Sequence, residues 1–305
     1  MPLIYYVFYF ILGSIIGSFL NVVIYRYNTN LSIIRGHSRC LSCNTDLKAL
    51  DLVPIFSMLF LKHRCRYCKT KISKQYIFIE ILMGAIFTFA LSKLFNHNYS
   101  GLELMNTILS LSVISLLVSI AVYDYKHFII PDGLVYSAIS LSFIKMLTYM
   151  YENTLIGNDF ILAILSGPII ASPLLIIWLA SSGRVMGFGD VKLAVVFGYF
   201  FGIIDGMATL AYSFWIGAVI MILVMLLQLQ YAAFSDVYNV FEIKLYGPRT
   251  KSFLQKYAPF ILKDYALKKA IPFGTFMVIA FISQYIFELP FGTVEDFMMY
   301  MGIFY

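Results

Sequence analysis

Apolar runs of about twenty residues follow one another along most of this chain. A helix needs about 20 such residues to cross the hydrocarbon core of a bilayer, and a spanning segment in lipid must satisfy all its backbone groups internally. Of the 305 residues, 61% are hydrophobic and only 12% are charged, well below the quarter or so that is typical of soluble domains. The sequence therefore predicts an all-α, polytopic bundle of membrane helices. We expect about eight spans: Leu3–Tyr25, Tyr76–Leu94, Glu103–Tyr123, Gly133–Tyr149, Phe160–Ala180, Val191–Ile204, Met207–Leu229 and Ala270–Phe287.

The net charge of +6 comes from two blocks of Lys and Arg rather than from an even excess. Ten of the 22 cations lie between Arg26 and Lys74, and seven more lie between Lys244 and Lys269. Basic loops between membrane helices stay in the cytoplasm under the positive-inside rule. We therefore expect an exported N-terminus, cytoplasmic basic loops that contact anionic lipid, and no nucleic-acid partner.

All four cysteines lie in the polar segment 26–75, which we call the ribbon. Cys40 and Cys43 form one CxxC pair, and Cys65 and Cys68 form another after 21 intervening residues. This spacing is typical of four thiolates that hold zinc in a closed, structural site. Two disulfides are the alternative, but thiols in a cytoplasmic loop stay reduced. We expect a small cytoplasmic zinc-ribbon-like domain.

Two acids stand at the ends of predicted membrane helices. Asp124 ends one span, and Asp190 opens a later one directly after Gly187 and Gly189. Each aspartate alone also fits a structural role, since Asp often caps a helix. Placing an acid at membrane depth costs free energy, however, so such a residue is first considered as a functional one. Facing each other across one boundary, the two carboxylates, called the dyad below, would share a proton, activate a water and polarise a peptide carbonyl.

Two further acids are candidate supporting residues. Glu80 lies near the cytoplasmic end of its predicted span. It fits either a boundary residue that reaches water or a side chain that supports the site or contacts the substrate. Asp132 follows Pro131 at the start of another span, where Pro is favoured and Asp commonly caps; we therefore favour a structural role for it.

The chain divides into five parts on this basis. They are a first transmembrane helix at 1–25, the ribbon at 26–75, a transmembrane catalytic core at 76–230, a cytoplasmic loop at 231–269, and a last helix with a tail at 270–305.

Taken together, these residues resemble the type IV prepilin leader peptidases, a family of intramembrane aspartyl proteases with a Gly-x-Gly-Asp motif. The similar positions follow in order along most of the chain: Gly17 to Arg26, Ser38 with the four cysteines, Asp51, Pro54, Ser57, Tyr76, Glu80, Asp124 through Asp132, Gly187 to Asp190, Lys192, and Pro272 to Gly274.

The resemblance implies that Asp124 and Asp190 are the catalytic pair of an enzyme in the cytoplasmic (inner) membrane. The implied reaction removes a short basic leader from prepilins or pseudopilins, after a glycine, at the cytoplasmic face. It also implies N-methylation of the new terminus from S-adenosylmethionine, with no residues assigned to that cofactor. Three positions depart from the family pattern: His63 stands where glycine is usual, and Ile77 and Thr275 stand where proline is usual.

Two other classes of function also fit part of the sequence. A proton-coupled transporter uses intramembrane acids, but these lie near the bilayer midplane between repeats, and no repeat is visible here. A non-enzymatic, zinc-bearing pilus assembly protein would explain the ribbon and would tolerate the loss of either aspartate.

Overall fold

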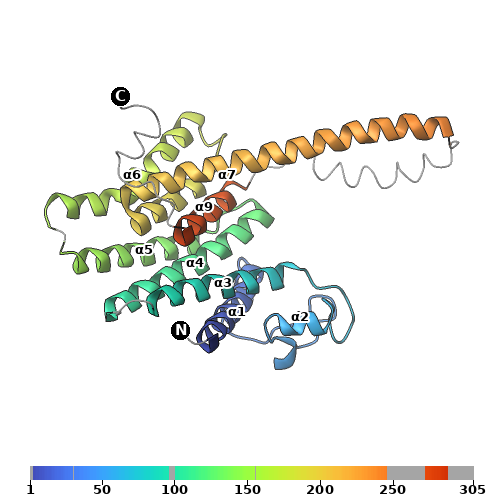
Figure 1. The fold of residues 1–305 in the computed structure, drawn as a ribbon, viewed down its shortest axis with the longest axis horizontal. Helices are drawn as coiled ribbons and strands as arrows, with labels where there is room; N and C mark the ends of the chain where they lie inside the picture. Colours follow the sequence, from blue (N-terminus) through green and yellow to red (C-terminus); the bar gives the residue numbers. More distant parts are fainter. Residues whose placement is uncertain (1–2, 30, 96–99, 155, 246–271, 288–305) are drawn as a thin grey trace.

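The structure is a computed structural model that describes residues 3–29, 31–95, 100–154, 156–245 and 272–287. Within these residues helices are the regular elements, and the predicted all-α class is confirmed. They lie side by side, with the ribbon at one end (Figure 1). The elements are α1 (Leu3–Arg26), the 3-10 turn η1 (Ala49–Asp51), α2 (Phe56–Phe60), α3 (Gln75–Phe95), α4 (Gly101–His127), α5 (Asp132–Glu152), α6 (Asn158–Ser181), α7 (Phe188–Leu245) and α9 (Phe273–Phe287).

Six helices of the described chain are long and apolar enough to cross a membrane: α1, α3, α4, α5, α6 and α7. The sixth and seventh expected spans both fall within α7, and the eighth corresponds to the shorter α9. The backbone of α7 continues as helix to Leu245, past the boundary expected at residue 230. The rest of the expected loop, 246–269, and the tail, 288–305, lie outside the described residues.

Helix α7 is broken at Gly202, so its two arms are separate helices. Gly202 has φ 84° and ψ −169°, a conformation that glycine adopts at little cost. A Cβ at Gly206 would stand 3.2 Å from the carbonyl oxygen of Phe197. Residues this far apart in a straight helix would be roughly 13 Å apart along its axis. The chain therefore folds back at Gly202, which supports two successive spans here.

Helices α1 and α3 pack at close range through glycines. A Cβ at Gly13 would lie 2.4 Å from the Met83 carbonyl oxygen, and one at Gly17 would lie 2.8 Å from Glu80 Cα. Small residues four apart let membrane helices approach in this way. Larger side chains at Gly13 or Gly17 would therefore push α1 away from α3.

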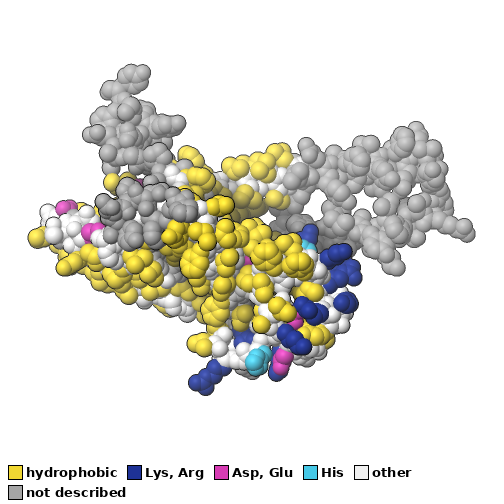
Figure 2. Space-filling view, turned by 60° about the horizontal axis from the view of Figure 1, so that its bottom comes forward, with side chains coloured by type: hydrophobic (Ala, Val, Ile, Leu, Met, Phe, Trp, Pro, Cys, Tyr) yellow, Lys and Arg dark blue, Asp and Glu magenta, His cyan; other side chains and the backbone are white. Residues whose placement is uncertain are grey.

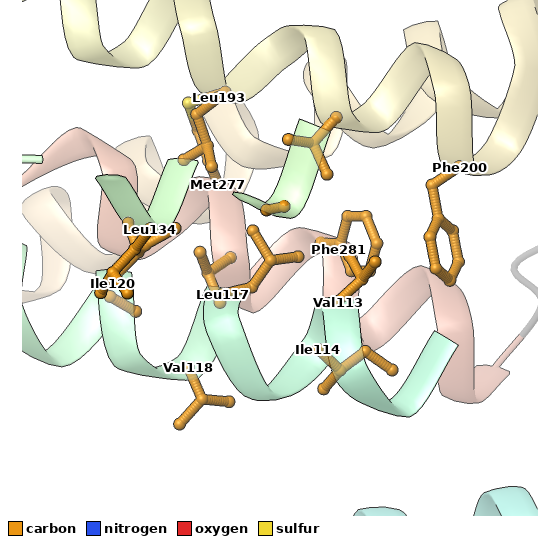
Figure 3. Close-up of a cluster of buried hydrophobic side chains, with 14 of the residues drawn as sticks. Val113, Ile114, Leu117, Val118, Ile120, Leu134, Leu193, Phe200, Met277 and Phe281 are labelled. Atoms are coloured by element: carbon orange, nitrogen blue, oxygen red, sulfur yellow. The ribbon is translucent and has the colours of Figure 1, made fainter. Parts of the chain in front are cut away.

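Helix α9 packs against both α4 and α7 within the hydrophobic core (Figure 3). Leu117 and Ile114 of α4, Leu193 of α7, and Met277 and Phe281 of α9 are fully buried. This packing holds the start of α9 against the end of α4.

The outer surface is apolar over the helices, while Lys and Arg gather toward the ribbon end (Figure 2). Large apolar side chains there are widely exposed, including Phe8, Ile176 and Trp215 at 60%, 64% and 66%. Soluble monomers rarely expose such continuous apolar area. The surface is that of a protein solvated by lipid.

Candidate active site and metal centre

The structure brings the dyad together. Asp124 lies in the last turn of α4 and Asp190 in the first turn of α7. Their exposed fractions are only 4% and 7%, and the two carboxylates are close enough to interact electrostatically. The arrangement expected from their positions at helix ends is thus present.

Ile130 fills the space where α4, α7 and α9 meet around the dyad. A Cβ at Gly189 would lie 2.8 Å from Ile130 Cβ, and a Cβ at Gly274 would lie 2.8 Å from Ile130 Cδ1 and 3.0 Å from Asp124 Oδ2. Gly189 is therefore needed for close approach and not for a left-handed backbone, since its φ is not positive. The carbonyl of Gly187 accepts the Asp190 N–H at 3.3 Å, which places Gly187 directly before the first turn.

Thr275 of α9 is the hydrogen-bond partner of Asp124, and the sequence analysis did not identify it as a site residue. Its N–H lies 3.1 Å from Asp124 Oδ2, and its Oγ1 lies 3.5 Å from the same oxygen. The sequence signals were its place beside Pro272, Phe273 and Gly274 at the start of a helix and its departure from the proline that the family resemblance gives as usual there.

Asp132 does not cap α5. The N-cap residue is Pro131, and no side chain provides a capping hydrogen bond. Asp132 instead forms an ion pair with Lys192 of α7, and its side chain is 64% exposed. It therefore lies beside the dyad as a surface link between α5 and α7.

Glu80 joins the ribbon to the membrane helices. Its side chain is buried, and Oε2 accepts the backbone N–H of Ile55 at 2.7 Å. Ile55 has φ 62°, which is strained for a β-branched residue and shows that surrounding contacts hold it in place. Glu80 also packs against Gly17, so α1, α3 and the ribbon meet at this carboxylate. The Glu80 carboxylate is therefore a buried link between the ribbon and α3, and a role in the site stays a prediction.

Changing Glu80 to alanine is expected to loosen the ribbon from the bundle. The substitution leaves the Ile55 N–H buried without an acceptor, which costs about 1–3 kcal/mol. Trypsin should then cut the ribbon at Lys62 and Arg64 about five to a hundred times faster. Glu152→Ala, which removes an exposed acid at the far end of α5, is the matched control. Equal cleavage rates for the two variants would show that Glu80 does not anchor the ribbon.

The four cysteines form one cluster. Their Sγ atoms all lie within 4.8 Å of one another, and those of Cys40 and Cys68 are 3.7 Å apart. Tetrahedral zinc with Zn–S bonds of about 2.3 Å requires sulfur atoms about 3.8 Å apart. The geometry fits one tetrahedral metal ion, and no other cluster of potential ligands of this kind occurs in the described part of the chain.

Each cysteine pair lies in the same kind of turn. An isolated bridge closes each turn, Arg39 with Asp46 in one and Arg64 with Lys71 in the other. The sequence repeats correspondingly as Arg-Cys-x-x-Cys-x-Thr, beginning at Arg39 and at Arg64. In the second turn, hydrogen bonds from the Thr70 hydroxyl and backbone N–H lower the pKa of Cys68 to about 6, while the pKa of Cys40 in the first turn is raised to about 11. The opposite shifts reflect thiols close enough to share their protons, and a metal ion would bind all four as thiolates.

Asp51 stabilises the second turn through hydrogen bonds. Its side chain is 3% exposed and accepts from Arg66 Nε at 2.6 Å, from Tyr67 Oη at 3.2 Å, and from the Lys48 N–H at 3.1 Å. Burial raises the pKa of Asp51, but these hydrogen bonds outweigh it, and the pKa lies below its ordinary value. Asp51 therefore acts as a fixed negative charge within the ribbon.

A cavity of about 910 Å³ lies between the ribbon and the helix ends. Its walls include acidic, basic and aromatic side chains, among them Asp51, Arg39, Tyr76 and Glu80. Lys126, in the last turn of α4, also lines it, so one wall reaches the helix end that carries the dyad. Its volume is within the range of pockets that bind small molecules and cofactors.

Fold and site together define a polytopic helical membrane protein with a buried aspartate dyad and a tetracysteine domain. Two family models match in order: the bacterial peptidase A24 N-terminal domain over residues 11–94 and the type IV leader peptidase family over residues 111–222. The chain belongs to the type IV prepilin leader peptidase family.

Curated relatives agree with this family. A prepilin leader peptidase/N-methyltransferase of Bacillus subtilis is 31% identical over 68% of this chain and 79% of its own length, and one of Vibrio cholerae is 29% identical over 67% and 80%. A third, of Myxococcus xanthus, is 42% identical, but that match spans 41% of this chain and only 35% of the relative. No solved structure matches significantly.

Proposed function

We propose that this chain is a membrane aspartyl endopeptidase that removes the basic leader of type IV prepilin-like proteins and N-methylates the new terminus. The observation that carries the proposal is the meeting of Asp124 and Asp190 in one buried site at the ends of two helices. The names of the relatives, which join both activities, support it.

The dyad supplies the chemistry of peptide hydrolysis. Two carboxylates in contact do not both ionise readily, so one holds a proton while the other is charged. The charged member takes a proton from water, and the protonated member donates to the oxygen of the scissile carbonyl. The proton passes between the two during the cycle, and the observed titration belongs to the pair.

We place the dyad and the ribbon at the cytoplasmic face of the inner membrane, with the N-terminus outside. The density of Lys and Arg in the ribbon supports this orientation. The dyad lies at the same end, because α1 leads into the ribbon and Tyr27, just beyond α1, accepts the N–H of Gly133 at the start of α5 at 3.0 Å. A transporter is disfavoured, since Asp124 and Asp190 lie in terminal turns and not at helix centres.

We propose zinc for the cysteine cluster and S-adenosylmethionine for the cavity. Four thiolates fill the zinc shell, so the metal has a structural role and leaves no position for substrate. A ligand with a carboxylate and a purine needs basic and aromatic partners, and the cavity walls provide both, in Arg35 and Lys126 and in Tyr25 and Tyr76. The cofactor would supply the methyl group.

The purified protein in detergent, incubated with a prepilin and S-adenosylmethionine, tests both activities by the mass of the product. The expected product has lost the leader and gained one methyl group. Unchanged mass would overturn the proposal, and cleavage without methylation would reduce it to proteolysis. Binding of radiolabelled S-adenosylmethionine, measured without prepilin, separates a lost cofactor site from slow methyl transfer.

A further inference from the structure

Asp124 is held by the N-terminus of α9. Thr275 is in the first turn of that helix, where backbone N–H groups have no partner within the helix. Its N–H points at Asp124 Oδ2 at 3.1 Å and is shared with the Pro272 carbonyl at the same distance. The α9 helix thus supplies a donor to a carboxylate on α4, and its positive end favours a negative group there.

The hydroxyl of Thr275 adds a second link to α4. Oγ1 donates to the Ala121 carbonyl at 3.0 Å and is 3.5 Å from Asp124 Oδ2. Ala121 is one helical turn before Asp124, so Thr275 contacts both the carboxylate and the backbone that carries it. A threonine holds the end of α4 at two points in this way.

Neighbouring residues leave Oδ2 little freedom to move. A Cβ at Gly274 would lie 3.0 Å from it, so only glycine at this position leaves room for the carboxylate. Ile130 closes the same region, at 2.8 Å from that Cβ position. Through Oδ2, the carboxylate of Asp124 is therefore fixed in one orientation.

We propose that Thr275 is a positioning residue for Asp124. It turns the carboxylate so that Oδ2 is occupied by donors of α9 and Oδ1 is left for Asp190, water and substrate. Thr275 itself does not touch the reacting atoms. This inference rests on the proposed function, since it assumes that Asp124 is catalytic.

Three variants of Thr275 separate the hydroxyl from the rest of the side chain. Thr275→Ser keeps both the N–H and a hydroxyl. Thr275→Val keeps the N–H and the shape of the side chain but removes the hydroxyl. Thr275→Ala keeps the N–H and removes both the hydroxyl and the methyl group. The control is Thr209→Val, because Thr209 is a fully buried threonine of α7 whose hydroxyl donates to the Asp205 carbonyl at 2.6 Å and does not contact the dyad.

The measurement is kcat and KM for cleavage of a prepilin by each purified protein, with Tm as the check on folding. A carboxylate that turns away from its productive orientation slows the chemical step without weakening substrate binding. We expect kcat to fall about threefold to tenfold for Thr275→Val and by at least as much for Thr275→Ala, with KM unchanged. Thr275→Ser should retain at least half of the wild-type kcat.

Two results would overturn the inference. One is a wild-type kcat for both Thr275→Val and Thr275→Ala. The other is an equal loss in Thr209→Val, which would show a general packing effect. The proposed function fails separately, if the wild-type protein does not cleave prepilin or if Asp124→Asn cleaves it at the wild-type rate.

Discussion

Replacing either Asp124 or Asp190 by asparagine is expected to reduce prepilin cleavage by roughly 10²- to 10⁴-fold. The amide keeps the size of the side chain and still accepts the hydrogen bond from Thr275, but it cannot take up and release a proton. The rate constant of cleavage in a single-turnover assay should fall for each variant, while zinc content and Tm stay at wild-type values. The double variant should be no worse than either single one, because the two groups act as a unit.

The control for this experiment is Asp132→Asn. It removes an acid that lies near the dyad on the surface and pairs with Lys192, without entering the buried site. Its cleavage rate should stay within a few-fold of wild type. Cleavage near the wild-type rate in Asp124→Asn or Asp190→Asn would remove that residue from the mechanism. Dependence on both, with no dependence on Asp132, would exclude a non-enzymatic assembly protein.

Removal of the metal is expected to unfold the ribbon and leave the helices in place. Zinc contributes roughly 10–16 kcal/mol to the folding of small tetracysteine or related domains, which lack a sufficient core of their own. Metal analysis should find one zinc per chain in the wild type and none when Cys40, Cys43, Cys65 and Cys68 are all changed to serine. Trypsin should then cut rapidly within 26–75.

Cys65→Ser is the sharpest single substitution, since Cys65 is the one buried cysteine at 2% exposure. Ser42→Ala, at an exposed position between the first pair, should leave zinc content unchanged. Undiminished zinc in the fourfold variant would show that the metal lies elsewhere. If zinc is lost while the ribbon still resists trypsin and the protein still cleaves prepilin, the metal is needed neither to fold the ribbon nor for prepilin cleavage.

Local patterns in the sequence predicted much of this molecule. The length of the apolar runs identified the helices, because a span must be helical and about as long as the bilayer is thick. The spacing of the cysteines predicted a cluster, because two matching turns bring their thiols to one point. Each of these inferences depends on residues that are near one another in sequence or are of a single chemical kind.

Contacts between distant residues could not be found in this way. Thr275 and Asp124 are 151 positions apart, and nothing in either local sequence indicates the other. Glu80 was a candidate, but its partner is a backbone N–H in the ribbon, and any residue type except proline carries that group. Asp132 has the typical position of a helix cap. Its carboxylate instead forms an ion pair with Lys192, so it makes no capping hydrogen bond.

The late position of α9 in the sequence affects when the enzyme can become active. During synthesis, α1 to α7 leave the ribosome before the residues around Thr275 exist, since domains and helices emerge from the N-terminus onward. A growing chain of this kind already contains both aspartates, but it lacks the helix end that holds one of them in place. Full proteolytic activity would therefore arise only after α9 has been synthesised and has packed against α4. A chain that lacks α9 would cleave its substrates more slowly than one that contains it.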